Sequence, residues 1–208
     1  MNSRTSLLEH PLDWIFSAPS HIAVLRALRD SKEGMSGRAV AREAGINHQA
    51  CAQAIKRLEA QGVIRRQGSG QTQLIHLNFD NVLVQEVLLS LVRKEREFWF
   101  HAQEEIAEKF KSMAHSATLF GSAARGEAQL GSDVDLLLTV EPRLKSKILE
   151  EARHFSQNFK QKYGVQLSPI VFTVQEVKAR IKKSDPLIRS VLKEGIELLP
   201  STMEELAP

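Results

Sequence analysis

The sequence has a single cysteine, Cys51, so it cannot form an internal disulfide framework. It has no apolar run that approaches the length of a transmembrane helix or of the apolar segment of a signal peptide. Its seven histidines are scattered, and none stand at the spacing of a zinc site. No internal repeat, low-complexity tract or nucleophile–histidine–acid arrangement stands out. We therefore expect a cytoplasmic protein without a zinc site and without a membrane partner.

Length and hydrophobic content suit one or two small domains. Of the 208 residues, 42% are hydrophobic, which is enough for a buried core in each of two domains. Up to residue 78, ten Lys and Arg stand against six Asp and Glu, a net charge of +4, whereas the remainder has 18 against 19, a net charge of −1. The positive charge belongs to the first part, which indicates a nucleic-acid partner there.

The first part predicts three helices and a β-hairpin, after an extension over residues 1–18. Ser20, Ser36 and Asn47 each stand at the N-cap position before a helical pattern. The predicted helices end near Asp30, at Gly45 and at Gly62. A strand over 63–66, a glycine-rich tip over 67–71 and a returning strand over 72–77 then form a wing.

This arrangement, with RLEAQGVIRRQGSGQTQLIHL as its most informative stretch, resembles the winged-helix transcriptional regulators of bacteria and archaea over residues 19–78. The resemblance implies that the third helix enters the major groove of double-stranded DNA and that the wing reaches phosphates or the minor groove. Gln can read adenine, and Arg and Lys serve guanine or phosphate. The side chains expected at DNA are His48, Gln49, Gln53, Lys56 and Arg57 in the third helix and Arg65, Arg66 and Gln71 in the wing. The alternative is that Lys56 and Arg57 only form a solvated helix face.

A charged, helix-favouring segment without Gly or Pro follows, from Asp80 to about Met113. It carries three consecutive aromatic residues, Phe98, Trp99 and Phe100. A helix that is apolar on more than one side must be covered by something. We expect a connecting helix that also pairs with a second copy in a homodimer. A helix that packs only on its own chain is an equally weighted alternative.

The stretch LFGSAARGEAQLGSDVDLLLTV, from Leu119 to Val140, has the pattern of a phosphate-handling site. The missing side chain of Gly121 lets backbone N–H groups approach a phosphate, and Ser122 adds a hydroxyl donor. Asp133 and Asp135 leave one strand on the same face, where they can bind one or two Mg²⁺ ions. An isolated Asp-x-Asp is more often a loop cap, but seven fixed positions would occur by chance only about once per 10⁸ starts. These positions are Gly121, Ser122, Arg125, Gly126, Ser132, Asp133 and Asp135.

Within this stretch, GSAARGEAQLGSDVDLLL resembles the signature of the DNA polymerase β nucleotidyltransferase superfamily, in particular its minimal nucleotidyltransferase branch. The resemblance covers roughly residues 115–200. It implies a small mixed α/β domain and metal-dependent transfer of a nucleoside monophosphate from an NTP, here ATP, to a hydroxyl. By position, Asp133 and Asp135 bind Mg²⁺ or Mn²⁺. The nucleotide-binding positions are Gly121, Ser122, Arg125, Gly126 and Ser132.

The sequence departs from the family in the strand expected over 165–173. Helices are expected before it, over 142–163, and after it, over 174–182 and 186–194. Nucleotidyltransferases of this type usually carry a third carboxylate in this strand, which acts with the metals to activate the attacking hydroxyl. In GVQLSPIVFT, alignment on Thr173 places Ser168 there. We count Ser168 among the catalytic positions and expect transfer to be weakened or absent.

Together these patterns predict an α/β protein of the α+β type in three parts. They are a winged helix-turn-helix domain with its extension over 1–78, a connecting helical segment over 79–114 and a nucleotidyltransferase domain with a small mixed sheet over 115–208. The leading hypothesis is a DNA-binding transcriptional regulator whose second domain binds NTP and Mg²⁺.

Three alternatives remain open at this point. The first is an active, antitoxin-like nucleotidyltransferase that modifies a protein, has a toxin partner and controls its own operon. The second is an enzyme that modifies a small-molecule hydroxyl, such as that of an aminoglycoside, for which a DNA-binding module is unexpected. The third is a nucleotide sensor with an inactive site.

Overall fold

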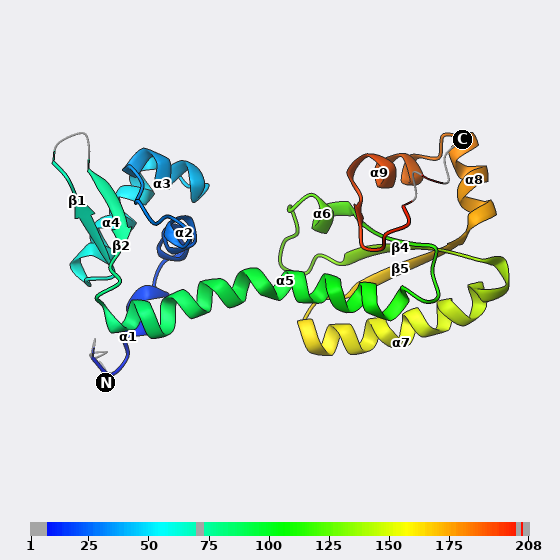
Figure 1. The fold of residues 1–208 in the computed structure, drawn as a ribbon, viewed down its shortest axis with the longest axis horizontal. Helices are drawn as coiled ribbons and strands as arrows, with labels where there is room; N and C mark the ends of the chain where they lie inside the picture. The colour runs from blue at the N-terminus through cyan, green and yellow to red at the C-terminus, as the bar shows by residue number, and fades with distance from the viewer. Residues whose placement is uncertain (1–7, 70–72, 203–204, 206–208) are drawn as a thin grey trace. The chain divides into compact units, whose positions relative to one another are not determined.

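Separate groups of buried apolar side chains organise the two halves of the chain. The computed structural model describes residues 8–69, 73–202 and 205. The chain divides into two compact units, Met1–Phe98 and Trp99–Pro208 (Figure 1). This division does not test the domain boundaries predicted at residues 78 and 114. Across the described residues, no helix combines the length and apolarity needed to span a membrane.

The first unit has the winged helix-turn-helix fold that its sequence predicts. Ser36 and Asn47 are N-caps as expected, since their side chains accept hydrogen bonds from the backbone N–H groups of Ala39 and Ala50. Apolar residues of the helices and strands of this unit share one core, which includes Val24, Leu28 and Leu58. The elements are α1 (Pro11–Ile15), α2 (Pro19–Leu28), α3 (Gly37–Glu43), α4 (His48–Ala60) and the antiparallel pair β1 (Ile64–Gln67) and β2 (Leu74–Leu77).

Two helices of this unit begin at prolines rather than where the sequence pattern places them. Within the extension predicted over 1–18, Pro11 interrupts a partly helical pattern, but α1 begins there and buries Ile15 in the core. Similarly, α2 begins at Pro19, with Ala18 as its N-cap in place of the predicted Ser20. Proline suits the first helical turn because the N–H that it lacks has no partner there and its φ is already helical.

The predicted connecting helix is present and continuous. It opens with a π-helical segment, η2 (Leu83–Leu88), and continues as α5 (Leu89–Phe110). Trp99 packs against the core of the second unit, whereas Phe98 and Phe100 are 49% and 56% exposed in the single chain. Pairing of this helix with a second copy stays a prediction.

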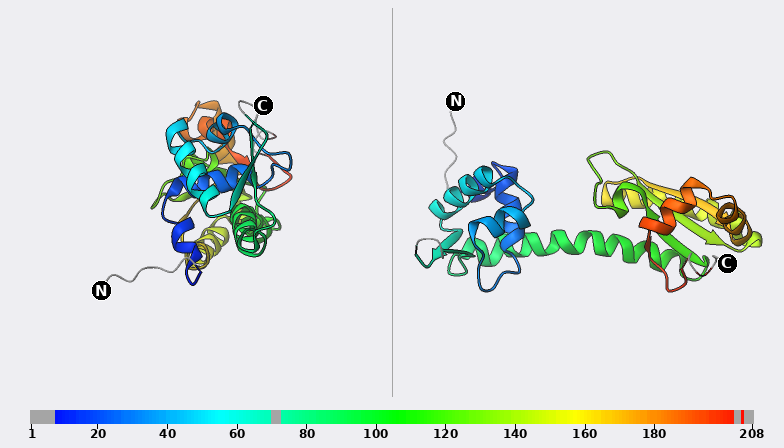
Figure 2. Two further views of the ribbon diagram at one scale, coloured as in Figure 1. Left: turned by 90° about the vertical axis from the view of Figure 1, so that its left-hand side faces the viewer. Right: turned by 90° about the horizontal axis from the view of Figure 1, so that it is seen from above.

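The second unit is a four-stranded mixed sheet between layers of helices (Figures 1 and 2). The spatial order is β5-β4-β3-β6, in which β4 and β5 are parallel and the other pairs are antiparallel. The helix α7 (Lys145–Tyr163) makes the crossover that parallel neighbours require. The strands are β3 (Ser116–Phe120), β4 (Val134–Val140), β5 (Leu167–Thr173) and β6 (Ile196–Glu197). This confirms the predicted fold class, although the two-residue β6 carries no sequence pattern.

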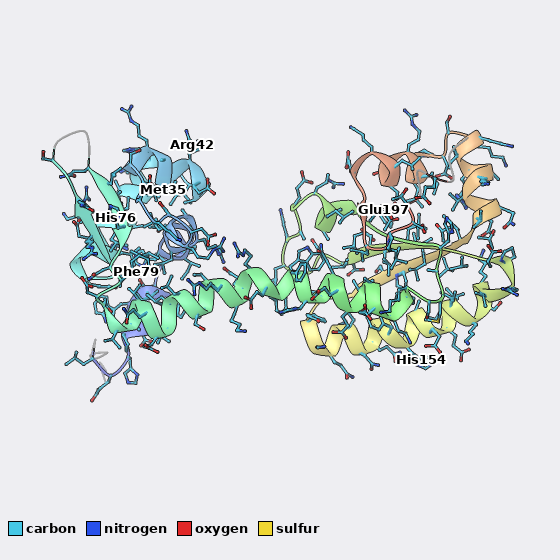
Figure 3. The ribbon with its side chains drawn as sticks, viewed as in Figure 1. Met35, Arg42, His76, Phe79, His154 and Glu197 are labelled. Atoms are coloured by element: carbon cyan, nitrogen blue, oxygen red, sulfur yellow. The ribbon has the colours of Figure 1, made fainter. Side chains whose placement is uncertain are left out.

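The two faces of the sheet are covered by different helices. Ala102, Ile106 and Phe110 of α5 join α7 over the face that carries Leu119, Leu136 and Leu138. The helices α8 (Val174–Lys182) and α9 (Pro186–Glu194) cover the face that carries Phe120 and Leu137. Because side chains alternate along a strand, Asp135 lies on this second face. On the same face, Thr118 donates a hydrogen bond to Glu197 of β6 at 2.7 Å (Figure 3).

Candidate functional site

The turn after β3 brings Gly121 against the carboxylate of Asp135. Phe120, the last residue of β3, pairs with Asp135 of β4 in the antiparallel register. Gly121 has a φ of +73° and begins the short helix α6 (Gly121–Ala124). A Cβ atom at this position would lie 2.3 Å from Oδ2 of Asp135. Both the positive φ and the close approach therefore require glycine here.

Asp133 and Asp135 meet at the end of the sheet, as their spacing predicts. Asp133 stands immediately before β4 and is exposed, while Asp135 lies in the strand and is partly buried. Burial raises the pKa of the Asp135 carboxyl, and the negative charge of Asp133 raises it further. The folded chain thus holds two carboxylates close enough to repel each other. A bound cation would relieve this repulsion.

Ser168, which the sequence predicts at the position of the third carboxylate, lies next to this pair. In the parallel register, Ser168 of β5 is the partner of Asp135 of β4. Its hydroxyl donates a 2.8 Å hydrogen bond to Oδ2 of Asp133. The alignment on Thr173 therefore agrees with the register of the sheet.

The site residues fit a hard divalent cation. Carboxylate and hydroxyl oxygens are the ligands that Mg²⁺ prefers, and Mg²⁺ usually binds through one or two carboxylates together with waters and substrate phosphates. Among the residues that the structure describes, no group of three or more His, Cys, Asp or Glu side chains could hold a metal ion. The chain thus offers two carboxylates, with Ser168 as a neutral neighbour.

The remaining predicted nucleotide-binding residues have local partners. Arg125 is exposed and donates to Glu127 at 2.7 Å and to Glu194 of α9 at 3.3 Å, and the hydrogen bond to Glu127 raises its pKa. Ser132 accepts a 2.9 Å hydrogen bond from the backbone N–H of Gln129. Gly126 has a φ of +71° with open space around it. Ser122 is partly buried in α6 and accepts a backbone hydrogen bond from Glu127 through its carbonyl.

A cavity of about 560 Å³ borders Asp135 and Ser168 at the edge strand β5. Polar side chains that the sequence does not single out contribute to its wall, namely Arg153, Gln157 and Gln166. Gln166 is held in place because its amide donates to Ser156 Oγ and to the carbonyl of Leu167, each at 3.0 Å. Arg153 and Gln157 lie in α7 among many charged residues. No sequence signal could have separated them from an ordinary solvated face.

In the winged-helix unit, α4 presents the predicted DNA-binding side chains to solvent. Cys51, Ala54, Ile55 and Leu58 form its buried face. The five predicted side chains of this helix are all exposed: His48, Gln49, Gln53, Lys56 and Arg57. Asn47 caps the end of the helix that carries His48 and Gln49. The sequence pattern therefore separates the two faces of this helix correctly.

The wing arginines are exposed but already paired with carboxylates. Arg65 donates to Asp80 at 2.8 Å, and Arg66 donates to Glu59 at 3.0 Å. Exposed ion pairs of this kind contribute little stability, typically about 0–1 kcal/mol, so a phosphate could replace the carboxylate partner. Gln71, predicted at the tip of the wing, lies outside the described residues.

A groove of about 560 Å³ connects α3, α4 and the wing. Its lining includes the predicted residues His48 and Arg66. Arg38 and Gln73 also line it, although no sequence pattern points to either residue. Arg38 stands one residue after the start of α3, where a basic residue in a short helix carries no distinguishing pattern.

Comparison with known families assigns both halves of the chain. Residues 102–198 match the model of the nucleotidyltransferase domain, and residues 18–72 match the model of the MarR family. A search of curated proteins found no match. Among solved structures, human N-acetylserotonin methyltransferase in complex with SAM shares 14% identity at a TM-score of 0.29. That match covers 52% of this chain and 37% of the methyltransferase chain.

The family matches agree with the two folds described above. Nucleotidyltransferase domains in general use an NTP and a divalent metal ion, and MarR-type domains are DNA-binding domains. The chain therefore joins a MarR-family winged-helix domain, residues 18–72, to a nucleotidyltransferase domain, residues 102–198.

Proposed function

We propose that this protein is a cytoplasmic transcriptional regulator that binds double-stranded DNA through its winged helix and binds ATP with Mg²⁺ through its nucleotidyltransferase domain. The observation that carries the proposal is the meeting of Gly121, Asp133 and Asp135 at one end of the sheet. Because Gly121 has no side chain, its backbone can lie close to Asp135. Gly121 also starts the turn that would bind the triphosphate. Asp133 and Asp135 would hold the metal ion.

Asp133 and Asp135 would hold the divalent cation, which would supply positive charge to neutralise the triphosphate. Gly121 and Ser122 would bind the phosphates through backbone N–H groups and a hydroxyl. Arg125 would exchange Glu127 and Glu194 for a phosphate, because guanidinium groups form strong paired hydrogen bonds with phosphate oxygens. These steps account for binding and orientation of the nucleotide.

Ser168 limits what this site can do after binding. A serine hydroxyl is too weakly basic to accept a proton as a general base near neutral pH. Ser168 itself donates a hydrogen bond to Asp133. The place that would hold a metal-binding, proton-accepting carboxylate thus carries a neutral donor. We expect nucleotide binding to persist and transfer of the nucleoside monophosphate to be slow or absent.

Calorimetric titration with ATP and with GTP tests the nucleotide site. Wild type should bind ATP in the presence of Mg²⁺ and lose most of that affinity in EDTA. In EDTA the two carboxylates of wild type and the triphosphate repel one another. Asp133→Ala/Asp135→Ala should lose the metal-dependent binding, because it lacks the carboxylates that would hold the cation. A matched control is Glu150→Gln, which changes an exposed carboxyl of α7 in the same unit. Equal, metal-independent binding by wild type and the double variant would remove the site assignment.

An active nucleotidyltransferase is the second candidate, and the cavity beside Asp135 and Ser168 favours it. That cavity could hold an acceptor, either a protein segment, such as one from a toxin partner, or a small-molecule hydroxyl, and Arg153 forms part of its wall. Incubation with labelled ATP, Mg²⁺ and cell extract separates the candidates. Rapid labelling of a specific acceptor that requires Asp135 would show that the protein is an active nucleotidyltransferase and not a regulator without transfer activity.

A further inference from the structure

A cavity of about 520 Å³ in the winged-helix unit is not one of the sites proposed above, although Arg57 in its wall is also a predicted DNA-binding residue. It lies between α1, the start of α2 and the C-terminal end of α4, and its wall consists of Trp14, Ser17, His21, Arg57, Ala60 and Gln61. We propose that it binds a planar anion whose ring edge donates hydrogen bonds, the chemistry that a guanine nucleotide offers. The site is separate from the ATP site of the other unit.

His21 contributes a buried hydrogen-bond acceptor. Its side chain is 1% exposed, and its Nδ1 atom lies 3.2 Å from the carbonyl oxygens of Trp14 and of Ile15. Carbonyl oxygens only accept hydrogen bonds, so Nδ1 carries the hydrogen. In the neutral ring Nε2 is then an acceptor, and it is buried with no partner among the described residues.

Gln61 contributes a second acceptor to the same cavity. Its Oε1 atom is buried and likewise has no hydrogen-bond partner in the described part of the chain. Most buried polar atoms in folded proteins are hydrogen-bonded, so two unpartnered acceptors in one cavity wall point to a missing group that donates. A ligand with two neighbouring donors would satisfy both atoms.

Trp14 and Arg57 indicate what the rest of the ligand is like. The indole of Trp14 is 47% exposed and offers a flat apolar surface on which a planar ring can stack. Arg57 is exposed at the end of α4, and no described carboxylate forms an ion pair with it. Guanine has two adjacent donors, N1–H and the 2-amino group, and a 5′-phosphate supplies the anion. The cavity volume is typical of small-molecule sites, about 300–1,000 Å³.

Titration with GMP, followed by the fluorescence of Trp14, tests the proposal. The full-length Trp99→Phe variant leaves Trp14 as the reporter, because the chain has two tryptophans. Measurement in EDTA, repeated in the Asp133→Ala/Asp135→Ala background, excludes a signal from the metal-dependent ATP site. A saturable change is expected with GMP. IMP lacks the 2-amino donor and AMP presents an acceptor at N1, so both should bind at least about tenfold more weakly.

Variants of the cavity wall complete the test. Gln61→Leu removes one acceptor and Arg57→Gln removes the cation, and each should weaken GMP binding by about tenfold or more. The control is Arg42→Gln, an exposed arginine of α3 in the same unit (Figure 3), which should bind GMP as the parent does. Far-UV circular dichroism melts verify that each variant is folded. The absence of a saturable change at millimolar GMP, equal affinity for AMP, or unchanged binding by folded Gln61→Leu would each overturn the proposal.

Discussion

At the scale of single residues, the charged form of Asp135, which we propose binds the metal ion, destabilises the folded state when no metal is bound. Its pKa is raised by burial and by the charge of Asp133, so the folded state holds this proton to a higher pH than the unfolded state does. Stability should therefore fall as pH rises from the unfolded value, about 3.9, through the folded value, and the cost should persist at pH 7. We predict that Asp135→Asn raises the melting temperature at pH 7 without metal and has little effect below pH 4.

Differential scanning calorimetry at several pH values measures this effect. Each kcal/mol gained should raise the melting temperature by about 4–8 °C in a domain of this size. Mg²⁺ should stabilise wild type but not Asp135→Asn, because only the charged carboxylate binds the ion. Glu150→Gln in the same unit serves as the control and should give no such pH-dependent gain. A lower melting temperature of Asp135→Asn at pH 7 would contradict the assigned cause.

At the scale of the element, α4 and the wing should carry the salt dependence of DNA binding. Lys56 and Arg57 are exposed on α4, and Arg65 and Arg66 are exposed on β1. Removal of one cation that binds a phosphate should reduce the slope of log affinity against log salt by about 0.9. A gel-shift with promoter DNA at several salt concentrations compares wild type with the variant that replaces all four residues by alanine. The control is Lys178→Ala/Lys182→Ala, which removes two cations from α8 of the other unit. An unchanged slope in the quadruple variant would mean that the DNA-binding face lies elsewhere.

At the scale of the whole molecule, the proposed regulator requires coupling between its two domains. If ATP with Mg²⁺ changes the affinity for an operator by some factor, the operator must change the affinity for ATP by the same factor. Coupling free energies of this kind are typically about 1–3 kcal/mol, or 5- to 150-fold in affinity. We expect a homodimer on a pseudo-palindromic operator with half-sites about one helical turn apart. Fluorescence anisotropy measures the operator affinity with and without ATP, and calorimetry measures the ATP affinity with and without operator. If neither ligand changes the affinity for the other, the two domains are not coupled.

The local features of this protein could be predicted from its sequence. The N-caps Ser36 and Asn47 depend on neighbouring residues only, and they are found where the pattern places them. The helix expected over 142–163 ends as predicted, and its C-cap is the left-handed Gly164. The alternation of strand side chains likewise places Asp133 and Asp135 together without knowledge of the fold. The proline starts of α1 and α2 are also readable in principle, but Pro11 is equally typical of a helix break and Ser20 of an N-cap.

The contacts that give the candidate sites their properties were decided by the tertiary structure. The sheet register brings Ser168 to Asp133, 35 residues away, and brings Asp135 against Gly121. The pairing of Arg125 with Glu194, across 69 residues, has no sequence signature, because any exposed glutamate could serve. The acceptors of His21 and Gln61, which have no partner within the described ranges, are buried because α1, α2 and α4 pack together. The sequence by itself determined which residues could do chemistry, through short-range periodicity and capping, whereas long-range packing decided which of them meet and which remain unsatisfied.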